Sequence, residues 1–114
     1  MRFLLYTLGD DTAPMVPPTP ELMAEMGAFM ADATAAGVLV ATGGLEPSAN
    51  STKVTGKNGT ITVTDGPFTE AKELTGGWAL VDVADKAEAV SWAKRFRAIV
   101  GDGESTIRQT FGPE

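Results

Sequence analysis

The sequence contains no cysteine and no histidine among its 114 residues. Without cysteine there is no disulfide and no thiolate nucleophile, and without histidine there is no imidazole base. Zinc and iron sites that depend on sulfur or imidazole ligands are excluded for the same reason. We therefore expect neither a bound metal nor a cofactor, and any acid–base chemistry falls to carboxylate and lysine side chains.

Basic residues are also scarce. Nine Lys and Arg stand against fifteen Asp and Glu, which gives a net charge of -6 and a pI near 4.5. Because such a chain is repelled by phosphate backbones and anionic lipids, we expect no nucleic-acid partner and no membrane partner. No segment approaches the roughly 20 consecutive apolar residues of a membrane span. The apolar start, residues 1–8, is too short for a secretory signal, so we expect a cytoplasmic protein.

What is present is an ordinary globular composition, with 43% hydrophobic and 21% charged residues. Independently folding domains usually have about 100–150 residues, so a chain of this length has room for one of them. We therefore expect a single domain over residues 1–114.

Hydrophobic periodicity predicts strands at 2–8, 38–41, 52–55, 60–64, 77–83 and 105–111, and helices at 20–36 and 85–100. Thr19 is expected to cap the first helix, and Gly37 to end it in a left-handed conformation. Asp85 and Glu88 resemble a capping box at the start of the second helix. The pair Asn58-Gly59, between runs rich in threonine and valine, predicts a tight hairpin turn.

This order is β-α-β, hairpin, β-α-β, which is the ferredoxin-like α+β plan with an inserted hairpin. Two helices cover only one face of such a sheet. The other face carries either Leu4, Tyr6 and Leu8 or Phe3 and Leu5, and both sets are too apolar to face water. We therefore predict a two-fold homodimer whose sheets pack face to face.

The helices carry two patterns with more than one interpretation. The first helix has an apolar stripe of Leu22, Met26, Phe29, Met30 and Ala33, with Met23 off the stripe. A methionine-rich helix surface is either flexible core filler or the wall of a partner or ligand site, and core filler is favoured. In the second helix, the cations Lys94, Arg95 and Arg97 are interpreted as a solvated helix end rather than an anion site.

The segment at 65–78 is the most distinctive in the chain. It begins with Asp65-Gly66-Pro67-Phe68, continues through an acidic-x-Lys-Glu stretch, and ends in Gly76-Gly77-Trp78 before a predicted strand. This pattern resembles the signature of the YCII-related domain family, specifically its DGPF branch, and the resemblance extends over nearly the whole chain. It implies a ferredoxin-like domain that dimerises into an α/β barrel.

The resemblance also has functional implications. A His and an Asp have been suggested as the active site in this family, and some members are fused to, or encoded beside, ECF-type sigma factors. Because this chain has no histidine, a His–Asp pair does not carry over. Only Asp65, within the matching motif, is transferred as a catalytic candidate.

Two interpretations of Asp65 stay open. The Gly66-Pro67 turn fixes the direction of its carboxylate, which either orients a ligand or accepts backbone N–H groups of Phe68 and Thr69. In the structural interpretation, Phe68 anchors the loop in the core or in a dimer interface.

The residues that follow Asp65 include a charged group. Glu70, Lys72 and Glu73 are predicted to lie on a short helical turn that ends at Gly76-Gly77. With Asp65 they form either a coupled charged cluster at a functional pocket or a solvated network of ion pairs.

Two functions are compatible with the sequence, and whether the protein is an enzyme stays open. In the first, a small molecule binds between the sheet and the second protomer, against Tyr6, Trp78 and Arg108, with Asp65 and Lys72 at the rim. Phe68 and Glu70 join this ligand-binding set from the same segment, and Asp65 supplies acid–base chemistry if there is any. In the second, the protein is a noncatalytic dimeric interaction module whose partner is a sigma-factor-related protein.

Overall fold

The structure is a computed structural model that describes residues 1–9, 17–46, 48–66 and 73–112. In chain order its elements are β1 (Arg2–Gly9), α1 (Pro20–Ala35), β2 (Leu39–Gly44), the short 3-10 helix η1 (Ser48–Asn50), β3 (Thr52–Lys57), β4 (Thr60–Asp65), β5 (Glu73–Asp82), α2 (Lys86–Val100) and β6 (Ser105–Gln109). Among the described residues, no helix is long and apolar enough to cross a membrane.

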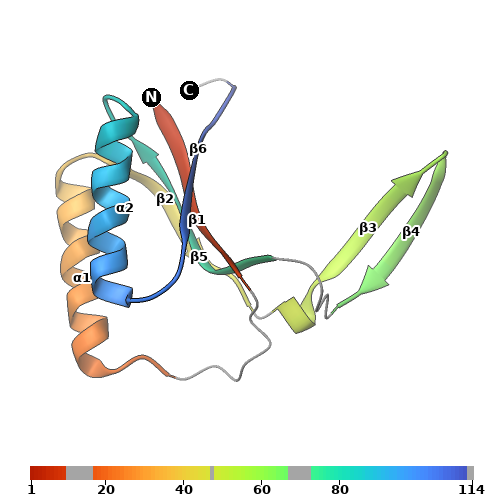
Figure 1. Cartoon of the computed structure of the whole chain (residues 1–114), viewed down its shortest axis with the longest axis horizontal. Coiled ribbons are helices and arrows are strands. Elements are labelled where there is room, and N and C mark those ends of the chain that lie inside the picture. The colour runs from red at the N-terminus through yellow and green to blue at the C-terminus, as the bar shows by residue number, and fades with distance from the viewer. Residues whose placement is uncertain (10–16, 47, 67–72, 113–114) are drawn as a thin grey trace.

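Four of the strands form one antiparallel sheet in the order β2-β5-β1-β6. Both helices lie on the same face of this sheet, and β3 and β4 form a separate hairpin that projects from the other side (Figure 1). This arrangement confirms the predicted ferredoxin-like α+β fold with an inserted hairpin. The sheet therefore has one face covered by helices and one face, which we call the open face, without a covering layer of helices.

Strand register decides which residues of β1 face the helices. Phe3 pairs with Val81 of β5, and both are buried in a core cluster that includes Ala89 of α2. Side chains alternate along a strand, so Phe3 and Leu5 face the helices, and Leu4 and Tyr6 lie on the open face. The sequence left open which apolar residues of this strand the helices would not cover. The structure shows that Leu4 and Tyr6 lie on the face without helices.

The core consists mainly of small and medium side chains and occupies one end of the layer between helices and sheet. Its buried members are Phe3, Val38, Val81, Val83 and Ala89, with Leu5, Ala79, Trp92 and Ile107 packed around them. Phe3, Val81 and Val83 lie near the end of the sheet where β1 begins and β5 ends. The other end of this layer is less completely filled, as described below.

Local signals place the ends of the helices close to where the sequence predicts them. The Thr19 hydroxyl accepts a hydrogen bond from the Leu22 N–H at 3.1 Å, and Gly37 adopts a positive φ of 71° after α1. At α2, the Asp85 carboxylate accepts from the Glu88 N–H at 2.9 Å. The reciprocal bond of the capping box comes from the Ala84 N–H, one residue earlier than the standard pattern.

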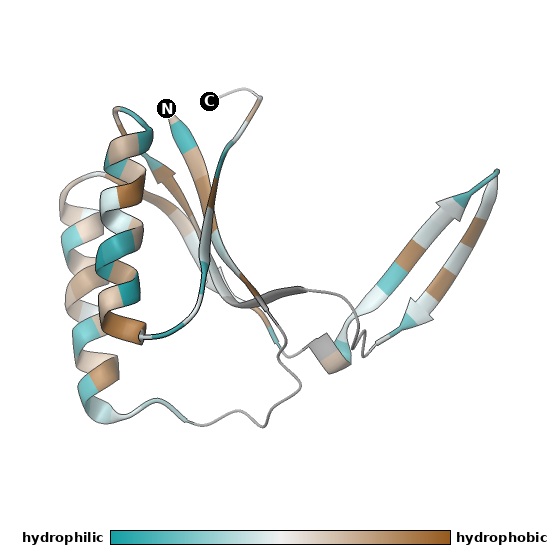
Figure 2. Ribbon diagram, viewed as in Figure 1, coloured by the Kyte–Doolittle hydropathy of each residue, from teal (hydrophilic) through white to brown (hydrophobic). Residues whose placement is uncertain are grey.

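The hairpin of β3 and β4 has the predicted two-residue turn. Asn58 and Gly59 both have positive φ, as a type I′ turn requires. Val54 pairs with Val63 and Gly56 with Ile61, so the aliphatic side chains share one face. Val54, Ile61 and Val63 are 68%, 67% and 67% exposed, and Figure 2 shows the apolar bands in both strands.

Four predicted boundaries are wrong by two residues or more, and one of them is the end of β3, which reaches Lys57 rather than residue 55. Residues 73–77 form part of β5 rather than the end of a helical turn, because Glu73 pairs with Gly9 and cross-strand pairing overrides a weak local helical preference. β2 extends to Gly44 because Gly43 leaves room for the Trp78 indole, which lies 3.1 Å from where a Cβ would be. β6 ends at Gln109, two residues before the predicted end.

Candidate functional site

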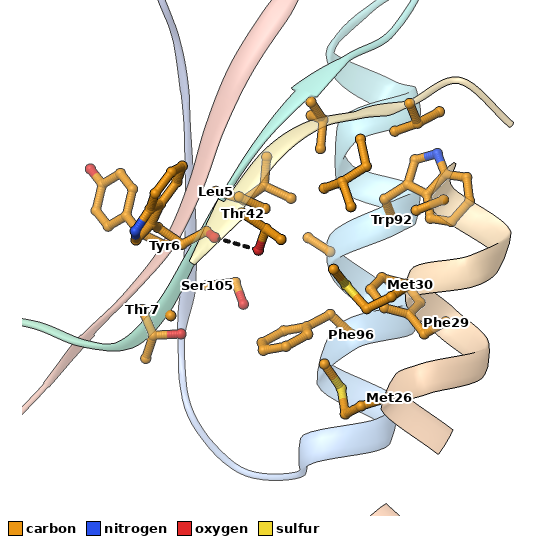
Figure 3. A pocket seen from close by; sticks show the side chains of 18 of the residues that line it. Leu5, Tyr6, Thr7, Met26, Phe29, Met30, Thr42, Trp92, Phe96 and Ser105 are labelled. Carbon is orange, nitrogen blue, oxygen red and sulfur yellow. Dashed lines mark hydrogen bonds between the residues drawn. The ribbon is translucent and has the colours of Figure 1, made fainter. Parts of the chain in front are cut away.

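An apolar cavity of about 290 Å³ lies between the two helices and the sheet. Met26, Met30, Trp92 and Phe96 line it from the helices, and Leu5, Thr7, Thr42 and Ser105 are among the residues that line it from the strands (Figure 3). The cavity adjoins the buried core and extends toward the end of the sheet where β1 ends and β6 begins. It is therefore a partly open pocket within a single chain, on the covered face of the sheet.

Helical spacing brings the methionines to this cavity. Met26 and Met30 are four residues apart on α1, so they lie on one face of the helix, and Figure 3 shows both side chains directed toward the strands. Across from them, the Phe96 ring of α2 is 6.3 Å from the Phe29 ring. Unbranched thioethers adapt their shape readily, so this wall can adjust around an occupant.

The polar groups of the cavity come from the strands. The Thr42 hydroxyl donates a hydrogen bond to the Trp78 carbonyl oxygen at 2.8 Å, so its only hydrogen is already used. Thr7 and Ser105 are direct cross-strand partners in β1 and β6, and they lie on the covered face with Leu5 and Ile107. The two hydroxyls therefore lie beside each other at one end of an otherwise apolar space.

Arg97 of α2 donates a hydrogen bond to each of these two hydroxyls. Its Nε donates to Ser105 Oγ at 2.8 Å and its Nη2 donates to Thr7 Oγ1 at 2.9 Å. Its Nη1 points to the carbonyl oxygens of Gly101 and Asp102, at 3.5 and 3.3 Å. One half-buried guanidinium thus links the end of α2 to both strands.

The sequence-based interpretation of the basic cluster is wrong for Arg97. We expected a solvated helix end, and Arg95 comes close to that description: it is half exposed and pairs with Asp32 at 2.8 Å. Arg97, two residues later, instead turns inward because Thr7 and Ser105 offer hydroxyl acceptors there. No periodicity in the sequence signals this pairing, because Thr7 is 90 residues away along the chain.

Three of the predicted ligand-binding residues lie on the open face, the face on which the sequence placed a site against a second protomer. Tyr6 pairs directly with Trp78, and Arg108 pairs with Leu4 in the adjacent row. In Figure 3 the Tyr6 ring lies on the far side of the strands from the helices. Tyr6 and Trp78 also border the cavity, although their side chains lie on the opposite face of the sheet. The register brings these three residues near one another on the open face.

The catalytic candidate Asp65 lies at the base of the hairpin. Its carboxylate accepts a hydrogen bond from the Thr52 hydroxyl of the paired strand at 2.9 Å, and it is exposed. The next residue, Gly66, donates its N–H to the Ser51 carbonyl at 2.7 Å. These contacts give Asp65 a structural partner in the hairpin and do not place it at the cavity.

The other predicted site residues, Phe68, Glu70 and Lys72, lie outside the described residues. Within the described ranges, no group of acidic side chains is arranged to hold a metal ion. The residues that sequence reasoning missed are Thr7, Ser105 and Arg97. For Met26 and Met30 a signal was present, since a ligand wall was the second interpretation of the methionine stripe.

Comparison with known protein families gives a match over most of the chain. The profile of the YCII-related domain matches residues 1–109, which is most of the chain and includes every strand and both helices of the fold. No curated protein matches the chain. The match agrees with the ferredoxin-like topology and with the motif that begins at Asp65. The chain therefore belongs to the YCII-related domain family.

Proposed function

We propose that this protein binds a small, predominantly apolar molecule in the cavity between its helices and its sheet. The observation that carries the proposal is the cavity itself, about 290 Å³ and lined mainly by methionine, aromatic and alanine side chains. Ligand pockets usually have volumes of roughly 300–1,000 Å³ and consist of apolar walls with a few polar groups. A cavity at the lower end of this range suits a molecule about the size of a substituted benzene.

The cavity favours binding over catalysis. Among the described residues that line it, no side chain is a carboxylate or a lysine, and the Tyr6 ring lies on the other face of the sheet. Acid–base chemistry by Asp65 would need that residue to approach a ligand from the hairpin. The binding role therefore needs only what the cavity contains, whereas the Asp65 chemistry stays a prediction.

We further propose that the protein is a homodimer whose second copy packs against the open face. Leu4, Tyr6, Trp78 and Leu80 form a half-buried apolar surface on this face, and no described helix covers it. Because a single protomer leaves this surface in contact with water, a second copy of the same face is a self-complementary cover. The ligand site predicted against Tyr6, Trp78 and Arg108 would then lie between protomers.

The binding proposal is tested by filling the cavity. Ala79 lines it from β5, so Ala79→Met places three additional heavy atoms inside it. We expect wild-type protein to bind the neutral probe 3-phenylpropan-1-ol in isothermal titration calorimetry, and Ala79→Met to weaken the binding at least about tenfold by steric exclusion. Ala28→Met, the same substitution on the exposed surface of α1, should bind like wild type. Equal affinity of all three proteins would contradict the proposal.

A noncatalytic interaction module is the second candidate, and the hairpin supports it. An isolated two-stranded hairpin is only marginally stable in water, yet this one exposes Val54, Ile61 and Val63 on a single face. A partner that covers this face would explain its composition, and a sigma-factor-related protein is the partner implied by the family resemblance. Replacing all three residues with threonine should abolish co-purification with such a partner and leave probe binding intact, whereas unaltered co-purification would exclude this role for the hairpin.

A further inference from the structure

The polar end of the cavity contains a positive charge that no carboxylate neutralises within the described residues. Arg97 is half-buried, and its hydrogen-bond acceptors are two hydroxyl and two carbonyl oxygens, all uncharged. The nearby Arg95 is more exposed and does have a carboxylate partner, Asp32. A guanidinium that is partly removed from water attracts a negative group more strongly than an exposed one, because water screens it less.

The direction of the hydrogen bonds makes Thr7 and Ser105 donors toward the cavity. Each hydroxyl accepts from Arg97, and neither donates to another group in the part of the chain that the structure describes. A hydroxyl has a single hydrogen, so each of these two has that hydrogen available for an occupant of the cavity. Figure 3 shows the Ser105 side chain on the helix side of β6, and Thr7 is its direct partner in β1 and also contacts Arg97 of α2.

Accepting a hydrogen bond from a cation strengthens a hydroxyl as a donor. The positive charge draws electron density from the oxygen, so the hydrogen that remains binds an acceptor more tightly. Thr42, which also lines the cavity, lacks both properties because its hydrogen is used by the Trp78 carbonyl and no cation contacts it in the described structure. The donor character is thus confined to one end of the cavity.

From this geometry we infer that the ligand is a small apolar carboxylic acid in its ionised form. Its hydrocarbon body lies among Met26, Met30 and Phe96, and its carboxylate oxygens accept hydrogen bonds from the Thr7 and Ser105 hydroxyls. Arg97, directly behind these hydroxyls, balances the ligand's charge without contacting it. This inference rests on the proposed function and adds the chemical class of the ligand.

Three probes that share one hydrocarbon body test the inference: 3-phenylpropionate, 3-phenylpropan-1-ol and 3-phenylpropan-1-amine. We expect wild-type protein to bind the acid at least about tenfold more tightly than the alcohol, since hydrogen bonds to charged groups are stronger than neutral ones. The amine should bind most weakly, because it brings a second positive charge close to Arg97. Isothermal titration calorimetry measures all three affinities.

Two variants separate the donor pair from the rest of the cavity. Thr7→Val with Ser105→Ala should lower the affinity for the acid far more than that for the alcohol, so that the two probes bind about equally; residual binding of the alcohol shows that the cavity is intact. Thr42→Val, a matched substitution in the same cavity, should preserve the preference for the acid.

Each outcome bears on one proposal or on both. Equal binding of acid and alcohol by wild type, or an unaltered preference in the double variant, would overturn the carboxylate inference and leave the cavity proposal standing. Failure of all three probes to bind would contradict both.

Discussion

On the covered face of the sheet, Phe3 and Val81 pack against α2, and the layer opens into a cavity toward Thr7 and Ser105. On the open face, one residue along the same strands, Leu4 and Leu80 form a continuous apolar surface with no described helix over it. The two faces are similarly apolar in composition, yet one contains a partly open pocket and the other presents a surface.

The difference follows from what covers each face. Helix packing leaves a pocket where small residues such as Ala79 and Ala93 lie across from the flexible methionines of α1, because neither set fills the layer completely. A face without helices has no such layer and needs a complementary surface from outside. Apolarity alone therefore does not distinguish a ligand site from an interface; the covering element does.

The largest expected effect comes from the packed end of the covered face. Phe3→Ala should lower the free energy of unfolding by about 3–5 kcal/mol, because it deletes a buried aromatic ring. Leu4→Ala, the next residue on the opposite face, should cost less, and its cost should depend on protein concentration as expected for a dimer interface. Urea denaturation at two protein concentrations measures both free energies of unfolding. A larger loss of stability in Leu4→Ala than in Phe3→Ala would contradict this ranking of the two faces.

A charge on the open face should separate the protomers. Leu80→Glu is expected to raise the dimer dissociation constant roughly 100-fold or more, because an unpaired carboxylate would have to be buried in the interface. Analytical ultracentrifugation measures the dissociation, and Ala28→Glu on the exposed side of α1 is the control. The proposed role of the open face is lost if wild type sediments as a monomer or if Leu80→Glu stays dimeric.

The two arginines of α2 differ in their surroundings: Arg97 is half-buried beside the sheet, and Arg95 is exposed to solvent. Arg97→Gln should destabilise the protein by about 1.5–3 kcal/mol, because charged hydrogen bonds to Thr7 and Ser105 are lost in a half-buried setting. Arg95→Gln should cost less than about 1 kcal/mol, since its ion pair with Asp32 is solvated. Thermal unfolding compares them, and equal losses would show that Arg97 is not the structural link described above.

The smallest effect is expected at the hairpin. Asp65→Asn keeps an oxygen that can accept from Thr52, so stability should change by less than about 0.5 kcal/mol. Binding of 3-phenylpropan-1-ol should also be unchanged, because Asp65 is not among the cavity residues. Loss of binding in a folded Asp65→Asn protein would instead restore the sequence-based prediction that this carboxylate acts at the ligand site.

The fold could be predicted because its signals are local. Thr19 and Gly37 define α1, Asn58-Gly59 defines the hairpin, and the order of elements then leaves few topologies. The segment before Trp78 was predicted incorrectly because its strand character comes from pairing with β1, which no local pattern encodes.

The site was harder to predict because it depends on register and on side-chain size. Alternation along β1 placed Leu5 and Thr7 opposite Leu4 and Tyr6, but it did not say which set the helices would cover. The volume left beside Met26 and Met30 depends on the combined sizes of side chains from several elements. The direction of Arg97 depends on two hydroxyls brought together by β1 and β6.

Native mass spectrometry of wild type, Ala79→Met and Leu80→Glu tests most directly the claim that the covered face binds a ligand and the open face binds a second copy. We expect a wild-type dimer that gains the mass of added 3-phenylpropionate, an Ala79→Met dimer that does not gain it, and a Leu80→Glu monomer that does. A wild-type monomer, or a ligand lost in Leu80→Glu and kept in Ala79→Met, would contradict it.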